Sequence, residues 1–199
     1  MRKEQKANYP ESARGAAALL VRMVLEDGAY TNIALNQYLR GSRLSDLDRR
    51  LATELVYGTV KASGTLDWYL AQCVSRPLDK VAGDILAILR ISTYQLLYMT
   101  RIPASAAVNE AVKLARSVSH EGSAKFVNGV LRGLLRKQEA GAFVLPDTEK
   151  QDADYLSLQY YHPRWLVKRW LGPWGRGGTE RLLAFDNTLR RCACVLIRW

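Results

Sequence analysis

The chain has 199 residues, of which 48% are hydrophobic, and a formal net charge of +10 at pH 7. Its apolar content is too high for a disordered chain, and its length suits one domain, or one domain and part of a second. Residues 1–140 hold 20 Lys and Arg against 13 Asp and Glu (+7), and residues 141–199 hold 9 against 6 (+3). This excess favours a polyanionic partner such as nucleic acid.

Cysteine and histidine are too few and too scattered for a structural site. Three Cys in a chain of this length do not make a disulfide scaffold. Cys73, Cys192 and Cys194 form no C-x-x-C pair, and His120 and His162 lie far from them in sequence. The usual spacing of zinc ligands is missing, so we predict no metal site.

The N-terminal region lacks the pattern of a signal peptide or a membrane anchor. Its apolar run at 16–21 is interrupted by Arg22, which leaves it too short to span a bilayer, and no small-residue cleavage site follows. We therefore expect a cytoplasmic protein without a membrane segment.

Helical periodicity dominates residues 1–140. Gly28 and Gly41 stop the first two helices, and Ser45 before Asp48 forms an acidic variant of the capping box at the start of a third. The pattern predicts about seven helices, at 11–26, 31–39, 45–60, 63–74, 79–99, 104–118 and 123–136.

The predicted helix at 79–99 is the most hydrophobic. Apolar residues cover most of its circumference, so it should be the central, buried helix. No strand-like alternation occurs in residues 1–140. The fold class that follows is an all-α bundle of two packed helical layers.

The last helix of this bundle has two chemically different sides over residues 125–136. One is apolar, and the other carries Lys125, Asn128, Arg132 and Arg136 at spacings i, i+3, i+7 and i+11. The apolar side consists of Val127, Val130, Leu131, Leu134 and Leu135. Gly129 and Gly133 each cost about 1 kcal/mol against Ala in a helix, so we expect another backbone to approach closely there.

After Lys137 the character of the sequence changes. Residues 141–153 are polar and read as a linker, and residues 154–161 are short and aromatic. His162-Pro163 opens a helix that Gly172-Pro173 stops, and Thr179 caps a last helix to about Asp186.

The sequence contains no recognisable active site. It lacks a Gly-rich phosphate loop and a nucleophile with an adjacent base, and Cys73 reads as a buried apolar residue. His120, in a polar turn, and His162, a predicted N-cap, read as structural. No catalytic or cofactor-binding residue is assigned.

The basic residues are more informative. They are concentrated in the N-terminal arm and first helix, and again in the last helix of the bundle. If those two helices are neighbours, the basic residues form one patch that binds RNA phosphates. Asn128 or Tyr9 would then touch bases. The predicted RNA-binding residues are Arg2, Lys3, Lys6, Arg14, Lys125, Asn128, Arg132, Arg136 and Lys137. The alternative is an ordinary solvated helix face.

Three segments, Leu44–Gly58, Ile102–Lys113 and Lys125–Arg132, resemble the NusB-like N-terminal domain of the Sun/RsmB family of small-subunit ribosomal RNA cytosine-C5 methyltransferases. The resemblance covers residues 12–137. NusB, an antitermination factor, shares the fold, but the segment His162–Leu166 resembles the methyltransferase continuation.

The resemblance implies an RNA-binding domain at 1–140 and the start of a small, incomplete α/β segment at 154–189. A catalytic domain that binds S-adenosylmethionine and uses two Cys would follow in the family. Neither Cys192 nor Cys194 maps onto that pair, so we expect no cofactor in this chain and no activity from it alone. Ribosomal RNA is the implied partner, and no protein partner is indicated.

The tail at 190–199 departs from the family pattern, which continues with a Pro-Pro pair and a strand ending in Arg-Ile/Val-Asn. One set of codons compatible with the tail encodes such a continuation in the neighbouring frame. Our hypothesis is that the tail is aberrant and arises from a frameshift. Two other functions stay open: a NusB-type transcription factor and a bundle that binds only proteins.

Overall fold

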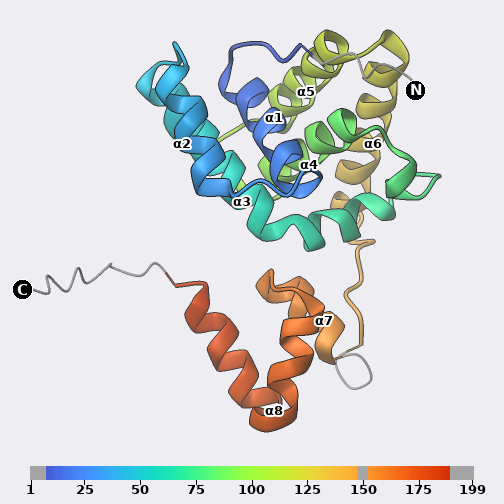
Figure 1. Ribbon diagram of the computed structural model, residues 1–199. Coiled ribbons are helices and arrows are strands. Elements are labelled where there is room, and N and C mark those ends of the chain that lie inside the picture. The colour runs from blue at the N-terminus through green and yellow to red at the C-terminus, as the bar shows by residue number, and fades with distance from the viewer. Residues whose placement is uncertain (1–7, 148–151, 189–199) are drawn as a thin grey trace, which may run out of the picture. The chain divides into compact units, whose positions relative to one another are not determined.

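The computed structural model describes residues 8–147 and 152–188, and every regular element within them is a helix (Figure 1). The predicted all-α class is confirmed. The chain divides into two compact units, residues 1–144 and 145–199. The first holds α1 (Ala13–Leu25), α2 (Thr31–Gly41), α3 (Asp46–Ala71), the 3₁₀ helix η1 (Leu78–Lys80), α4 (Gly83–Tyr98), α5 (Ala104–Val118) and α6 (Glu121–Glu139).

Local capping explains where several of these helices begin. The Ser12 side chain accepts a hydrogen bond from the Gly15 amide at 3.1 Å and caps α1. The predicted start of α3 at Ser45 is confirmed, since Ser45 Oγ accepts from the Asp48 amide at 3.2 Å and donates to the Asp48 carboxylate at 2.7 Å. At α2 the N-cap is Tyr30, which makes no side-chain capping hydrogen bond.

Helix α3 corrects the predicted break between 60 and 63. It runs without interruption for 26 residues, although Gly58 and Gly64 lie inside it. Tertiary packing outweighs these poor helix formers, because Thr59, Ala62 and Leu66 are all buried in the middle of the helix. Two predicted helices are therefore one, and the first unit has six α-helices and a 3₁₀ turn.

The predicted centre of the bundle is confirmed as α4. It packs against α1 and α3 and also against α5 and α6. Ile85, Ile88, Leu89 and Ile91 are at most 3% exposed and join the main hydrophobic core. A tight contact with α3 occurs at Gly58, where an added Cβ would collide with the Tyr94 ring.

One ion pair within the bundle is partly removed from solvent. Arg90 of α4 donates two hydrogen bonds, each 2.8 Å long, to the two carboxylate oxygens of Asp67 on α3. The Arg90 side chain is 12% exposed. This bidentate geometry fixes the rotation of α4 against α3.

Helix α6 is oriented by its apolar side and by its first turn. Val127, Leu131 and Leu134 are fully buried, as predicted from their spacing. His120 is the N-cap, and its Nδ1 accepts from the Ser123 amide at 3.3 Å. These contacts leave the polar side of α6 at the surface.

The second unit contains α7 (Asp152–Tyr160) and α8 (Arg164–Asp186), which pack around Leu156, Val167 and Leu183. The described residues of this unit contain no strand, and the tail at 190–199, which we expect to be aberrant, lies outside the described residues. The Tyr160 hydroxyl donates to Glu180 at 3.0 Å and ties the two helices together.

Helix α8 differs from its predicted outline. It is interrupted at Gly175, whose φ of +59° suits glycine, rather than at Gly172-Pro173. Its N-cap is Pro163, not His162. Thr179 is buried, and its hydroxyl has no hydrogen-bond partner in the described residues, so it does not cap the last segment.

None of the helices in the described parts of the chain is both long enough and apolar enough to cross a membrane.

Candidate nucleic-acid interface

One side of α6 carries three exposed cations, Lys125, Arg132 and Arg136, which we call the α6 cationic face. In the described part of the chain none of them forms an ion pair within 4 Å. Asn128 is half-buried and accepts a hydrogen bond from Arg132 Nε at 2.9 Å. The guanidinium of Arg132 is thereby oriented while its charge stays unneutralised.

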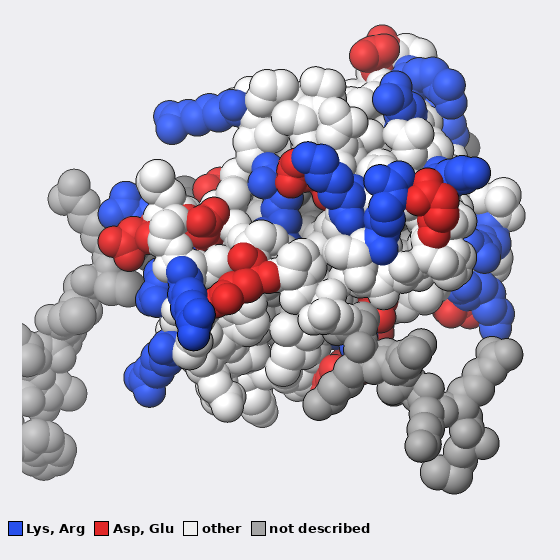
Figure 2. All heavy atoms as spheres, turned by 90° about the horizontal axis from the view of Figure 1, so that it is seen from above, with Lys and Arg blue, Asp and Glu red and all other residues white. Residues whose placement is uncertain are grey.

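The neighbouring helix α5 behaves differently. Its Lys113 lies 2.8 Å from Glu110, and its Arg116 lies 2.7 Å from Glu121 of α6. Figure 2 shows the wider pattern, in which Lys and Arg side chains spread across the upper face with carboxylates set among them. In the described residues, the absence of ion pairs within 4 Å thus distinguishes the α6 cations from those of α5.

The glycines of α6 do not have the predicted role. An added Cβ at Gly129 or Gly133 would meet no atom within 4 Å, so no backbone of the described chain approaches them. Helical spacing places Gly129 on the same side of α6 as Lys125 and Arg136. The two glycines therefore leave open space beside the α6 cationic face.

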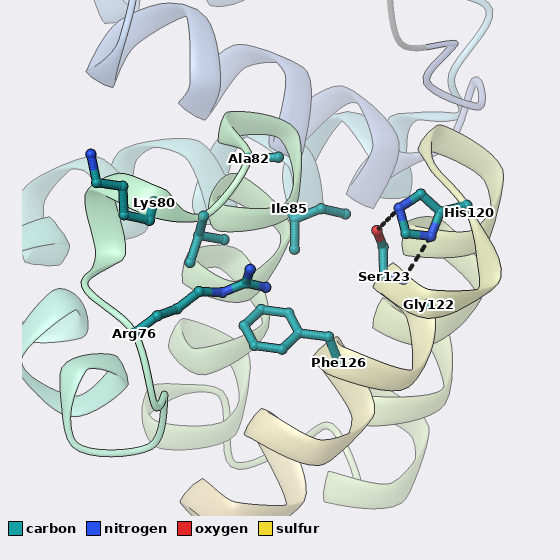
Figure 3. A pocket seen from close by; sticks show the side chains of 9 residues that line it. Arg76, Lys80, Ala82, Ile85, His120, Gly122, Ser123 and Phe126 are labelled. Atoms are coloured by element: carbon teal, nitrogen blue, oxygen red, sulfur yellow. Dashed lines mark hydrogen bonds between the residues drawn. The ribbon is translucent and has the colours of Figure 1, made fainter.

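A pocket of about 270 Å³ lies at the N-terminal end of α6, facing the loop that precedes α4 (Figure 3). The Arg76 guanidinium lies over the Phe126 ring, 4.6 Å from its centroid. Lys80 is exposed, and its 3.9 Å contact with Asp79 joins two side chains that are more than 70% exposed. The lining residues are Arg76, Lys80, Val81, Ala82, Ile85, His120, Gly122, Ser123 and Phe126.

The pocket offers contacts suited to a nucleotide. An aromatic face and a guanidinium plane accept a stacked base, and the exposed ammonium and guanidinium groups accept phosphate. Sequence reasoning missed Arg76, Lys80 and Phe126. Two cations in a Pro-containing loop were the only hint of this site in the sequence. The sequence of that loop does not show that Arg76 contacts Phe126, which lies 50 positions later in the chain.

Two of the predicted RNA-binding side chains are engaged inside the bundle. Arg14 is half-buried and donates to Gln95 at 2.9 Å, and Gln95 is 1% exposed. Lys137 donates to the Gln72 carbonyl at 2.5 Å, at the C-terminal end of α3. Helix α1 packs on α2, α3 and α4, whereas α6 packs mainly on α5 and α4, so the first and last helices of the bundle are not major packing partners.

The remaining predicted residues, Arg2, Lys3 and Lys6, lie outside the described residues. Tyr9, the alternative base contact, is held within the fold. Its hydroxyl donates to Asp84 at 2.5 Å, and Asp84 also lies 3.3 Å from Arg22. Burial, and then the hydrogen bond to Asp84, raise the pKa of Tyr9 well above its ordinary value.

This contact anchors the described N-terminal end of the chain. Asp84 stands in the first turn of α4, next to the pocket residue Ile85. The described chain therefore enters the bundle at the N-terminal end of α4.

Replacing Tyr9 by Phe is expected to lower the free energy of unfolding by about 1.5 kcal/mol, because a part-buried hydrogen bond to a carboxylate is lost. Urea unfolding followed by circular dichroism measures this. The matched control is Tyr38→Phe, because the Tyr38 hydroxyl has no hydrogen bond in the described residues and its loss should change little. Equal effects of the two substitutions would contradict the anchoring role.

The described residues contain no group of three or more His, Cys, Asp or Glu that would hold a metal ion. Cys73 is half-buried, and burial raises the pKa of its thiol.

Taken together, fold and surface define an all-α domain with a cationic helix face and an adjoining pocket. The model of the NusB family matches residues 11–136, so the chain belongs to the NusB family. Over 176 residues it is 41% identical to a probable ribosomal RNA small subunit methyltransferase B of Synechocystis sp., covering 88% of this chain and 39% of that protein. The chain thus spans about two fifths of the length of this relative.

Solved structures show the same fold. A complex of the antitermination factors NusB and NusE with double-stranded RNA matches with a TM-score of 0.58 at 20% identity, over 63% of this chain and 95% of that one. The crystal structure of PH0851 matches with a TM-score of 0.67 at 19% identity, over 94% of this chain and 40% of that one. The second match extends beyond the NusB-like bundle into the second unit.

Proposed function

We propose that this chain is the NusB-like, RNA-binding portion of a small-subunit ribosomal RNA cytosine-C5 methyltransferase, and that it acts in the cytoplasm. The observation that carries the proposal is the α6 cationic face. Its cations form no ion pair within 4 Å in the described residues, and it lies on the same helix as the Phe126 pocket. A cationic surface beside a stacking site suits RNA better than an apolar protein partner.

The roles of the residues follow from their positions. Arg132 and Arg136 bind phosphates and fix the register of the RNA, while Asn128 orients Arg132. An unpaired base stacks in the pocket on Phe126 and Arg76, and Lys80 binds its phosphate. Arg14 and Lys137 stabilise the bundle rather than contact RNA, because their side chains donate hydrogen bonds to Gln95 and Gln72.

Methyl transfer is assigned to the part of the longer relatives that this chain does not span. In the resembled family that part binds S-adenosylmethionine. Residues 8–147 and 152–188 present no catalytic set of their own, so we expect the chain alone to bind RNA without methylating it.

The second unit favours the methyltransferase over the alternative, a NusB-type antitermination factor. The NusB family match ends at residue 136, whereas the similarity to the methyltransferase covers 88% of the chain. A free-standing NusB-type factor has no need of α7 and α8, which pack around their own hydrophobic cluster.

Filter binding of a small-subunit ribosomal RNA fragment over a range of salt concentrations tests the proposal. The logarithm of the binding constant should fall linearly with the logarithm of salt concentration, because each bound phosphate releases counterions. Absent binding, or binding that ignores salt, would contradict an RNA-binding role.

A further inference from the structure

From its start to Arg176, helix α8 contains four cations and no acid. They are Arg164, Lys168, Arg169 and Arg176. Helix α7 neutralises two of them, because Asp154 pairs with Arg164 and Asp152 lies 2.5 Å from Arg176. In the described residues, Lys168 and Arg169 have no ion-pair partner, and both are exposed.

The two unpaired cations flank an exposed tryptophan. Trp165 precedes Lys168 by three residues and Arg169 by four, so the three side chains share one side of α8. The Trp165 side chain is 65% exposed. Val167, on the other side of the helix, is fully buried in the cluster with Leu156 and Leu183, so the packing of α8 directs Trp165 outward.

Trp165 differs from the other tryptophans of this helix. Trp170 packs against the hydrophobic cluster, and it stacks on Trp174 with centroids 6.1 Å apart and planes 23° apart. In the described part of the chain Trp165 has no aromatic partner. Its indole face is therefore available to an outside ring.

We propose that Trp165, Lys168 and Arg169 form a second RNA contact, which takes unpaired RNA. A base stacks on the Trp165 indole, and the phosphates on either side bind Lys168 and Arg169. An apolar protein surface fits this face poorly, because it would bury two cations without partners. Unpaired RNA is favoured over a duplex, because a stacked base must be splayed out of its strand. The proposal rests on the proposed function, that this chain binds RNA.

The test compares variants of the full chain with a short, unstructured RNA oligonucleotide and with its duplex. Trp165→Ala should weaken binding of the single strand about tenfold and that of the duplex much less, because stacking on a free base is lost. Trp165→Phe, which keeps an aromatic face, should recover part of the loss. Lys168→Ala with Arg169→Ala should reduce the salt slope by about 1.4, since each single-strand phosphate contact contributes about 0.7.

Arg181→Ala is the matched control, because it removes one exposed cation from α8 beyond the Gly175 interruption. Circular dichroism verifies that each variant is folded. The inference is overturned if Trp165→Ala binds the single strand like the unmodified chain while substitutions in the α6 cationic face weaken it. If the unmodified chain binds no RNA at all, the proposed function fails first and this inference fails with it.

Discussion

Substituting Arg132 and Arg136 together by Ala is expected to weaken RNA binding on the order of 10- to 100-fold at about 0.1 M salt, because two phosphate contacts and their counterion release are lost. The salt slope should fall by about 1 for each residue. Both side chains are exposed and lie opposite the buried side of α6, so the bundle should unfold at the same urea concentration as before. Filter binding at several salt concentrations gives both quantities.

The matched control is the double variant Arg50→Ala and Lys61→Ala. It removes the same charge from an exposed side of α3, where neither residue has an ion pair in the described part of the chain. This variant should leave the salt slope unchanged. If the two double variants lose equal affinity, net charge rather than the α6 cationic face governs binding, and the proposed interface is wrong.

Much of the helical framework was predictable because its determinants are local. The apolar coverage of 79–99 correctly placed α4 at the centre, and Ser45 with Asp48 correctly marked the start of α3. Capping groups and apolar spacing act within a few residues, so a sequence displays them directly. The break expected near residue 60 was wrong because the continuity of α3 depends on its burial against other helices.

The functional surface was harder to predict because its environment is set by distant residues. Lys125, Arg132 and Arg136 are exposed cations, as their spacing indicated. Arg14 and Lys137 have equally basic side chains, but their partners lie 81 and 65 positions away in the chain. The pocket likewise joins Arg76 to Phe126 across the fold. Periodicity indicates which side of a helix is polar, but not which groups from other parts of the chain bind its side chains.

Gly58→Ala is expected to lower the free energy of unfolding by about 1–3 kcal/mol, since the added methyl group overpacks the contact between α3 and α4. The new Cβ would collide with the Tyr94 ring, which already packs against Tyr98 with centroids 5.4 Å apart. Movement of that ring would disturb α4 at the centre of the bundle. Urea unfolding followed by circular dichroism measures the loss.

Gly129→Ala makes the same chemical change in an α-helix where nothing lies within 4 Å, so it isolates the helix propensity. It should raise the free energy of unfolding by roughly 1 kcal/mol. The same variant is expected to bind RNA more weakly, because its methyl group stands between Lys125 and Arg136 where a phosphate backbone approaches. A more stable protein with reduced RNA affinity would explain why a glycine with no close contact in the described fold occupies this position. Unchanged RNA affinity would mean that the open space beside Gly129 is not part of the interface, and an equal loss of stability from both substitutions would contradict the packing assigned to Gly58.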